Sequence, residues 1–569
     1  MQEGRFWQSR SLTCDDQYPE CGPLATAAQE YVTVNIQEGT LRGELSQTYT
    51  GNPIYRFQGI PYAEPPVGDL RFQPPVTKAA WSGERDALKA SSQCPQFRSN
   101  ALSGNEDCLY LNVYGPGTPA PTDSPKSVIV WFHGGCFTRG IGSSVTPDYF
   151  VDNDIIFVGT NYRLGVLGFI STGDEVVPGN MGLKDQAEAL RWVKRNIAAF
   201  GGDPNRVTLL GQSAGSASVH YHVLSPMSAG LFKNAIGMSG TTLSPWAFSK
   251  NATDRTIRFA KYLGYTGSTS TELLAFMKTI DWTRLVVDAN NALSEEDSTS
   301  LFTCVWVPSA EPQHDGAFLT EQPATLVAEG RYNLVPYMAG VTDLELLSQT
   351  HSGGILSTEE QINNLNQNFD EIVACDIRLP TRQEQLNGAH SVKQFYYNGS
   401  DITVQDSYTT TLMTSHLYFT EGVDTVIRSM SRFSSQPVFQ YEFTFVGPLN
   451  AYPSGPGQST VEDKVYRVLR RCLLEEKASL GEKAGLSGCG SIISNWQNGW
   501  LNQRPCVQKG QGVVTCADIG WNDILSRQRK GGQRRHKSGY DGGRYGGGWW
   551  LEGQWCWNLK KRQSQWRGL

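Results

Sequence analysis

Short apolar runs alternate with turns and helical stretches from Tyr31 to about Val468. Runs rich in β-branched and aromatic residues cover 128–132, 155–158, 207–210 and 438–446, and such runs predict strands. The first three are almost uninterrupted apolar runs, which is typical of strands buried on both faces of a mostly parallel sheet. Residues 181–199, between two of these runs, predict a helix. The pattern therefore predicts an α/β fold with a mostly parallel central sheet flanked by helices.

The composition divides the chain into three parts. Residues 1–30 form a polar N-terminal segment, 31–468 form the alternating body, and 469–569 form a tail. Eight of the fifteen tryptophans fall between Trp496 and Trp566. Because neither helical nor strand periodicity holds there, we expect an irregular, basic, Gly/Trp-rich tail outside the fold.

The tail is basic although the chain is acidic. Residues 527–569 hold eleven Lys or Arg and two acids, a local charge of +9 in a chain of net charge −6, so the remainder carries −15. A segment of this composition could bind nucleic acid or anionic surfaces. We favour a mis-spliced or unrelated tail without selected function, and therefore expect no nucleic-acid partner.

Twelve cysteines in 569 residues indicate an oxidising compartment. Two N-glycosylation sequons, at Asn251 and Asn398, agree with that compartment. No run of 18 apolar residues is present, so no membrane span is predicted. The first residues lack the apolar segment of a signal peptide, and we expect that the natural N-terminus is missing from this sequence.

The strongest chemical signal is Gly211-Gln-Ser-Ala-Gly215, placed between the predicted strand 207–210 and a helical segment. A Gly-x-Ser-x-Gly sequence in this setting predicts a sharp strand-to-helix turn that presents Ser213 as a nucleophile. The glycines are needed because larger side chains two positions from the serine would collide in so tight a turn. The helix N-terminus would favour negative charge beside the hydroxyl.

A second motif, His133-Gly-Gly-Cys136, follows the predicted strand 128–132. Acyl transfer places negative charge on a carbonyl oxygen, and fixed backbone N–H groups must stabilise that charge. We expect the amides of Gly135, Cys136 and Ala214 to form this oxyanion hole.

Together with six further segments, these two motifs resemble the type-B carboxylesterase/cholinesterase family. The residues around the motifs are similar to those of arthropod esterases. The resemblance covers about residues 31–468 and implies an α/β-hydrolase fold that cleaves carboxylic esters without metal or cofactor. The further segments are Phe57-Gln-Gly-Ile-Pro-Tyr-Ala63, Pro65-Pro-Val-Gly-Asp-Leu-Arg-Phe72, Glu106-Asp-Cys-Leu-Tyr-Leu-Asn-Val113, Asn161-Tyr-Arg-Leu-Gly-Val-Leu-Gly-Phe169, Gly179-Asn-Met-Gly-Leu-Lys-Asp-Gln186 and Phe200-Gly-Gly-Asp-Pro204.

The resemblance implies a disulfide between Cys94 and Cys108 and a secreted, extracellular protein. It also implies that Glu345, in Gly340-Val-Thr-Asp-Leu-Glu345, orients the catalytic histidine, with Asp343 as a nearby competitor. Leu346 departs from the glycine usual in the family. Residues 95–107 lack the tryptophan that holds choline in cholinesterases, and Gln212 stands where those enzymes have glutamate, so a choline ester is not the expected substrate.

The catalytic histidine is missing from its place in the pattern. The family has Gly-x-x-His after the strand predicted at 438–446, and this chain has Gly457-Gln-Ser-Thr460. A threonine hydroxyl cannot act as a base near neutral pH, so Ser213 would not be activated. His220 and His222 lie roughly 10–14 Å along the helix from Ser213 at helical rise, and His133 approaches from the wrong side. No other of the eight histidines matches a catalytic position in the family.

Two functions from different classes remain open at this stage. The first is a hydrolase of small-molecule carboxylic esters that works through an acyl-serine at Ser213. The alternative is a catalytically inactive, cholinesterase-like adhesion or binding protein with a protein partner. A reading-frame or splice error near Thr460 would explain the missing histidine and the tail together, and we favour this hypothesis because Ser213, Glu345 and the oxyanion motif all persist.

Overall fold

A computed structural model describes residues 30–377 and 379–443. The predicted segment 1–30 (apart from Glu30), the position Thr460 and the predicted tail 469–569 lie outside these residues. The division at residue 468 therefore stays a prediction.

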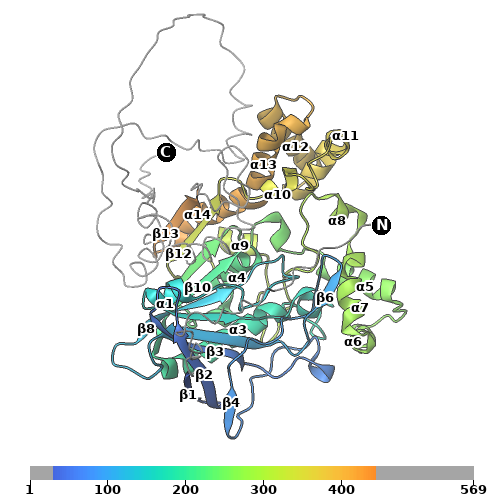
Figure 1. Ribbon diagram of the computed structural model, residues 1–569. Helices are drawn as coiled ribbons and strands as arrows, with labels where there is room; N and C mark the ends of the chain where they lie inside the picture. Colours follow the sequence, from blue (N-terminus) through green and yellow to red (C-terminus); the bar gives the residue numbers. More distant parts are fainter. Residues whose placement is uncertain (1–29, 378, 444–569) are drawn as a thin grey trace, which may run out of the picture.

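One mixed sheet of eleven strands is the centre of the described fold (Figure 1). Its order is β1-β2-β3-β7-β9-β8-β10-β11-β12-β13, with β4 beside β2. Neighbours from β9 through β13 run parallel, whereas β1, β2, β3, β7 and β9 pair antiparallel. The strands are β1 (Glu30–Ile36), β2 (Gly39–Gln47), β3 (Pro53–Pro61), β4 (Glu84–Asp86), β7 (Tyr110–Pro116), β8 (Lys126–Phe132), β9 (Ile156–Thr160), β10 (Gly202–Gln212), β11 (Asn234–Met238), β12 (Tyr337–Thr342) and β13 (Val438–Phe443), with β5 (Gln96–Arg98) and β6 (Ala101–Ser103) in a separate hairpin.

Helices cover both faces of the sheet, as the sequence predicts. On β8, Val128, Val130 and Phe132 point into the larger apolar core, while Ile129 and Trp131 point into a second core on the opposite face. Helices α3 and α4 contribute to the larger core and α1 to the second one. The alternation explains why β8 is apolar along its whole length.

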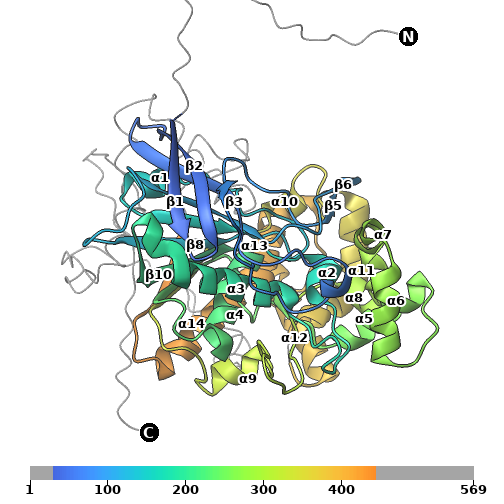
Figure 2. The same ribbon diagram turned by 90° about the horizontal axis from the view of Figure 1, so that it is seen from below.

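Helices α10 to α13 and α5 to α7 form two groups outside the central sheet. In Figure 1, α10 to α13 gather at the top and α5 to α7 at the right, away from β1 to β4, and Figure 2 keeps α5 to α7 together at the right. The helices are α1 (Asp148–Asp152), α2 (Gly165–Phe169), α3 (Met181–Asn196), α4 (Ala214–Leu224), α5 (Ala252–Leu263), α6 (Ser270–Thr279), α7 (Trp282–Val287), α8 (Glu295–Thr299), α9 (Pro323–Ala328), α10 (Leu347–Thr350), α11 (Glu359–Asp376), α12 (Arg382–Tyr397), α13 (Ser407–Ser415) and α14 (Glu421–Phe433).

Strand register brings distant segments to one edge. Gln212 on β10 pairs with Met238 on β11, and Met238 pairs with Gly340 on β12. Since these strands are parallel, the chain leaves all three at the same edge of the sheet, where ligand sites of open α/β sheets lie. Candidate catalytic residues that follow β10 and β12 are thereby collected on one side of the molecule.

Candidate active site

Ser213 occupies the sharp turn between β10 and α4. Its backbone lies at φ 56° and ψ −121°, a conformation that non-glycine residues rarely adopt. The turn is fixed on both sides, because the Ser213 amide donates to the Met238 carbonyl at 2.8 Å and the Ser213 carbonyl accepts from the Ala217 amide at 2.9 Å. Strain held by the surrounding structure is typical of functional residues.

The glycines of the motif allow close packing around this turn. A Cβ on Gly211 would collide with the carbonyl oxygen of Gly215, and a Cβ on Gly215 would collide with the carbonyl oxygen of Phe132 at the end of β8. The turn is therefore pressed against both its own helix and the strand that leads into the second motif.

The loop after β8 lies directly beside Ser213. A Cβ on Gly134 would be 3.0 Å from the Cβ of Ser213. Gly135 has φ 109° and Cys136 has φ 59°, so the loop has an unusual backbone that turns repeatedly through the left-handed region. Within the described residues, no acceptor takes a hydrogen bond from the amides of Gly135, Cys136 or Ala214. These donors are available to a ligand beside Ser213.

His133 holds this loop rather than facing Ser213. Its ring is buried and stacks on Tyr162 with 4.4 Å between ring centroids. Its Nδ1 lies 2.9 Å from the Gly134 carbonyl oxygen, and the Tyr162 hydroxyl donates to the His133 carbonyl at 2.8 Å. Burial lowers the pKa of His133 to about 4, against the hydrogen bond to Gly134, which raises it. The imidazole is thus neutral near pH 7, and its Nδ1 contacts the loop backbone.

The two histidines of α4 are also buried and engaged elsewhere. His222 lies 2.7 Å from the Ser228 hydroxyl through Nδ1 and 3.0 Å from Oε1 of Gln186 through Nε2. His220 uses Nδ1 to contact the Thr242 hydroxyl at 2.9 Å. Burial lowers the pKa of each to about 3. Within residues 30–377 and 379–443, no histidine forms a hydrogen bond with Ser213.

Glu345 lies three residues beyond β12, at the edge where β10 delivers Ser213. The residue is 1% exposed, and its Oε1 accepts a hydrogen bond from the Thr342 amide at 2.8 Å. Its own amide donates to the Ser415 hydroxyl at 2.9 Å, which joins the turn to α13. Asp343, the competitor from sequence, is half-buried and accepts from the adjacent Leu344 amide at 3.1 Å.

The neighbouring strand β13 runs parallel to β12, with Phe443 opposite Thr342. The chain therefore leaves β13 beside the turn that carries Glu345. Thr460, the predicted place of the histidine, lies outside the described residues.

Comparison with known proteins identifies the family. A sequence model of the carboxylesterase family matches residues 30–482. The chain is 35% identical over 444 residues to venom carboxylesterase-6 of Apis mellifera, covering 72% of this chain and 74% of that protein. It is 35% identical over 431 residues to esterase FE4 of Myzus persicae (74% and 75%) and 34% identical over 439 residues to juvenile hormone esterase of Tribolium castaneum (73% and 72%).

The chain belongs to the carboxylesterase family. The resemblance stated from its motifs is confirmed, and the mostly parallel sheet flanked by helices is the α/β-hydrolase fold of this family. Membership also establishes the broad chemistry, which is that of carboxylic ester hydrolases.

Two disulfides are present in the described part of this carboxylesterase. Cys94 and Cys108, the pair that the resemblance implies, are bonded with their Cα atoms 5.0 Å apart. The second bond joins Cys136 to Cys304 with Cα atoms 5.3 Å apart. Sequence reasoning missed Cys304. A cysteine inside the Gly-rich motif was the only signal, and it does not reveal a partner 168 residues away.

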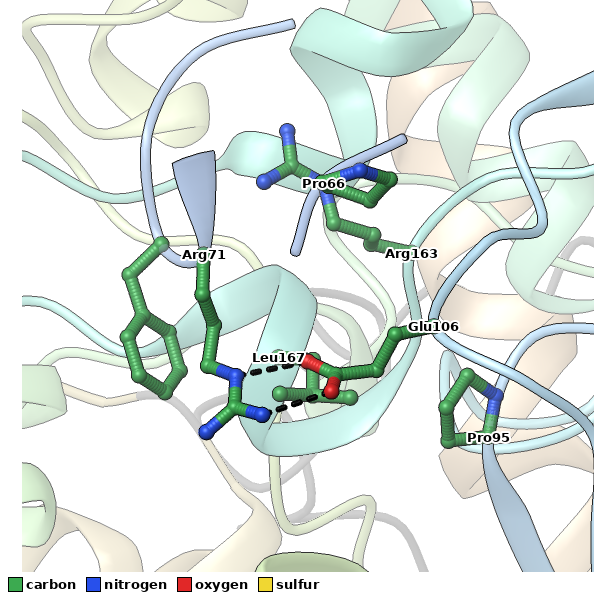
Figure 3. Close-up of a pocket in the computed structure, with 7 residues that line it drawn as sticks. Pro66, Arg71, Pro95, Glu106, Arg163 and Leu167 are labelled. Carbon is green, nitrogen blue, oxygen red and sulfur yellow. Dashed lines mark hydrogen bonds and ion pairs between the residues drawn. The ribbon is translucent and has the colours of Figure 1, made fainter. Parts of the chain in front are cut away.

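An ion pair between half-buried Arg71 and buried Glu106 links two of the family motifs near the first disulfide (Figure 3). Arg71 donates through Nε and Nη2 to the two carboxylate oxygens of Glu106, each at 2.6 Å. The pair borders a small cavity together with Pro66, Pro95 and Leu167. Ser213 is not among the residues that line it, so we assign this pair a structural role.

Aromatic side chains pack beside the Ser213 turn. A Cβ on Gly240 would lie 3.2 Å from the Ser213 carbonyl oxygen and 2.8 Å from the ring of Trp246. The Trp246 ring lies 6.1 Å from that of Phe302 and 5.5 Å from that of Phe419, between centroids. These rings form an aromatic cluster whose Trp246 lies next to the Ser213 backbone.

Asn251 and Asn398 are both exposed, at the start of α5 and the end of α12. Their glycosylation stays a prediction. Among the described helices, none is long and apolar enough to cross a membrane.

Proposed function

We propose that this carboxylesterase hydrolyses small-molecule carboxylic esters through an acyl-serine intermediate at Ser213. The observation that carries the proposal is the placement of the strained Ser213 turn against the loop 134–136, whose amides have no acceptor within the described residues. A nucleophile next to unused backbone donors is the arrangement that acyl transfer requires.

In this mechanism the Ser213 hydroxyl oxygen attacks the ester carbonyl carbon, and its proton passes to a base. The negative charge on the carbonyl oxygen is stabilised by the amides of Gly135, Cys136 and Ala214. The tetrahedral species collapses, the alcohol leaves with the proton from the base, and water then releases the acid from the acyl-serine. Glu345 would hold a histidine base in the correct tautomer and orientation.

Thr460 supports a sharper proposal about this sequence. With threonine at the position of the base, acylation and deacylation of Ser213 both lose their proton acceptor. Loss of one triad member can lower turnover about a millionfold, on the order of 8 kcal/mol of activation barrier, while the oxyanion hole retains some catalysis. The chain as written is therefore proposed to be a very slow esterase.

The alternative function is an inactive, extracellular binding protein, and Thr460 is the specific observation that favours it. Secretion is common to both proposals. It is supported by the two disulfides and the exposed sequons, and one relative is named a venom carboxylesterase.

The test is incubation with p-nitrophenyl acetate, an activated ester, followed by mass spectrometry of the peptide that contains Ser213. We expect slow p-nitrophenol release and an acetyl group on Ser213, because deacylation without a base is also slow. Ser213→Ala should remove both signals, and Ser268→Ala, at an exposed serine, should change neither. Rapid turnover that depends on Ser213 would show that a base is present, and absence of any acetyl-Ser213 would favour the binding protein.

A further inference from the structure

The peptide between Gly135 and Cys136 is held inside its loop by the Thr138 and Arg139 amides, which donate to the Gly135 carbonyl at 3.0 Å and 3.1 Å, and from outside the loop by the disulfide at Cys136. Cys136 has φ 59° and Phe137 has φ 57°, so two consecutive non-glycine residues occupy the left-handed region. Such backbone persists only where the surrounding structure holds it in place. The amide that this conformation presents beside Ser213 is one of the proposed oxyanion donors.

Hydrogen bonds fix the loop after Cys136. The Gly165 amide donates to the Phe137 carbonyl at 2.7 Å. Gly140 exchanges two hydrogen bonds of 3.0 Å with the side chain of Gln96. The amides of Gly135 and Cys136 themselves have no acceptor within the described residues, so the disulfide to Cys304 is the covalent link at this point of the loop.

The segment around Cys304 is held in place by hydrogen bonds to neighbouring helices and loops. The Gln349 side-chain amide donates to the Leu301 carbonyl at 3.2 Å, and the Ser300 hydroxyl contacts the Asp376 carboxylate at 2.9 Å and 3.0 Å. The Trp306 indole donates to the Ala289 carbonyl at 3.1 Å. Cys304 is 4% exposed. These contacts tie the segment to α10 and α11.

We propose that Cys304 is a positioning residue for ester hydrolysis, because its disulfide holds the Cys136 amide where the oxyanion forms. The inference rests on the proposed function of Ser213. Loss of one oxyanion donor typically lowers kcat about 10²–10³-fold. Removal of the clamp should therefore slow acylation by up to that factor, with little change in the affinity for the ester.

The clamp is also sensitive to reductants. A dithiol reductant transfers two electrons to the Cys136–Cys304 bond, which yields two thiols and an oxidised, cyclic disulfide of the reductant. Cys136 is half-buried, whereas Cys94 and Cys108 are each at most 1% exposed. Since thiol–disulfide exchange requires access to a sulfur, the Cys136–Cys304 bond should be reduced first.

The test compares Cys304→Ser with a matched control, Cys94→Ser/Cys108→Ser, which removes the other disulfide. The first readout is amide hydrogen exchange of residues 134–138, and the second is single-turnover acetylation of Ser213 at several p-nitrophenyl acetate concentrations. We expect faster exchange and about 10²–10³-fold slower acetylation at saturation in Cys304→Ser. The control should exchange more slowly at residues 134–138 and acetylate faster than Cys304→Ser, because Cys94 reaches this loop only through the hydrogen bonds of Gln96 to the Cys94 carbonyl and to Gly140.

Unchanged exchange at residues 134–138 in Cys304→Ser would overturn the clamp, and this readout does not depend on esterase activity. Faster exchange with unchanged acetylation would overturn the positioning role. Failure of the parent chain to acetylate Ser213 would reject the proposed function, and with it the positioning role, whatever exchange shows. If Cys304→Ser does not fold, dithiothreitol treatment of the folded parent chain replaces it. Cysteine alkylation then maps the reduced bond, and reoxidation must restore the acetylation rate.

Discussion

At the scale of single residues, the Ser213 turn requires glycine at positions 211 and 215. A Cβ on Gly215 would meet the carbonyl oxygen of Phe132, and backbone of a central strand cannot shift at low cost. Overpacking of this kind costs about 1–3 kcal/mol and sometimes more. Both the stability of the fold and the position of the loop after β8 therefore depend on Gly215.

We expect Gly215→Ala to lower the free energy of unfolding by about 1–3 kcal/mol and to abolish acetylation of Ser213. Gly388→Ala is the matched control, because Gly388 also lies in a helix and its nearest neighbours, at 3.2–3.4 Å, are methyl groups of the Ile377 and Leu379 side chains rather than backbone. Alanine is favoured over glycine in helices, so the control should be neutral or stabilising. Urea unfolding measures both, and equal effects would contradict the collision.

Buried histidines make stability depend on pH. His133 has its pKa lowered by burial to about 4, whereas an unfolded histidine titrates near 6.5. Below pH 6.5 the unfolded chain binds a proton at this histidine, whereas the folded chain does not until the pH nears 4. The free energy of unfolding is therefore highest above pH 6.5 and falls as the pH decreases toward 4. The loss is up to about 1.4 kcal/mol per pH unit for each such histidine.

Urea unfolding at several pH values between 7 and 4.5 should therefore show stability falling with decreasing pH. His133→Phe keeps a ring beside Tyr162 and removes one titrating group, so its profile should be flatter than that of the parent chain. His390→Gln, at an exposed histidine of α12, should leave the profile unchanged. A parent-like slope in His133→Phe would contradict the burial argument.

Local motifs were sufficient to predict much of the candidate site. Ser213 and the loop 133–136 lie within short sequences whose geometry is fixed by neighbouring residues, so pattern and spacing predicted their placement. Cys304 could not be predicted, because its partner is set by the packing of segments far apart in the sequence. The Ser415 contact to the Glu345 turn was missed for the same reason.

At the scale of elements, the sequence located strands better than it located their ends. The run 207–210 predicted β10, which begins at Gly202 and ends at Gln212. The polar residues 203–206 gave no apolar signal, and the pairing with β8 shifts register between Gly202 and Val207. Backbone pairing does not require apolar side chains. Likewise, the predicted helix 181–199 ends at Asn196 and continues as a 3₁₀ turn through Phe200.

A buried ion pair joins the segment after β9 to helix α3, and each partner lies in one of the family motifs. Arg163, after β9, donates through Nε and Nη2 to the carboxylate of Asp185 on α3 at 2.8 Å and 2.6 Å. Both side chains are at most 3% exposed. Removal of one partner leaves an uncompensated buried charge, which typically costs about 3–5 kcal/mol.

We expect Asp185→Asn to lower the free energy of unfolding by about 3–5 kcal/mol. Glu321→Gln is the control, because Glu321 and Arg331 form a similar two-contact pair with side chains 44% and 45% exposed, and solvent screens such pairs. Its effect should be far smaller. Chemical unfolding measures both variants, and comparable losses would show that burial of the Arg163–Asp185 pair does not set its contribution.

At the scale of the whole molecule, the strand order assembles the candidate site from segments far apart in sequence. Parallel pairing of β10, β11 and β12 places Ser213 and Glu345 beyond the same edge, and β13 ends beside β12 with Phe443 opposite Thr342. The last described residue, Phe443, thus lies on the strand next to the one that leads to Glu345, 17 residues before the predicted histidine position. This arrangement gives the hypothesis of a lost histidine a direct test.

Thr460→His should restore esterase activity if Thr460 occupies the place of the base. A positioned general base contributes about 10²–10⁴-fold in rate, and we expect at least this gain in p-nitrophenyl acetate turnover, up to the about millionfold cost of a missing triad member if the imidazole is fully positioned. The gain must depend on Glu345, because an imidazole without its acidic partner has neither the correct tautomer nor the correct angle. Thr460→Gln, which adds a polar side chain that cannot act as a base, is the matched control. No gain in Thr460→His would reject position 460 as the histidine site. The remaining explanation would then be a reading-frame change across residues 440–569, which sequencing of the transcript detects. A gain that survives Glu345→Gln would remove Glu345 from the triad.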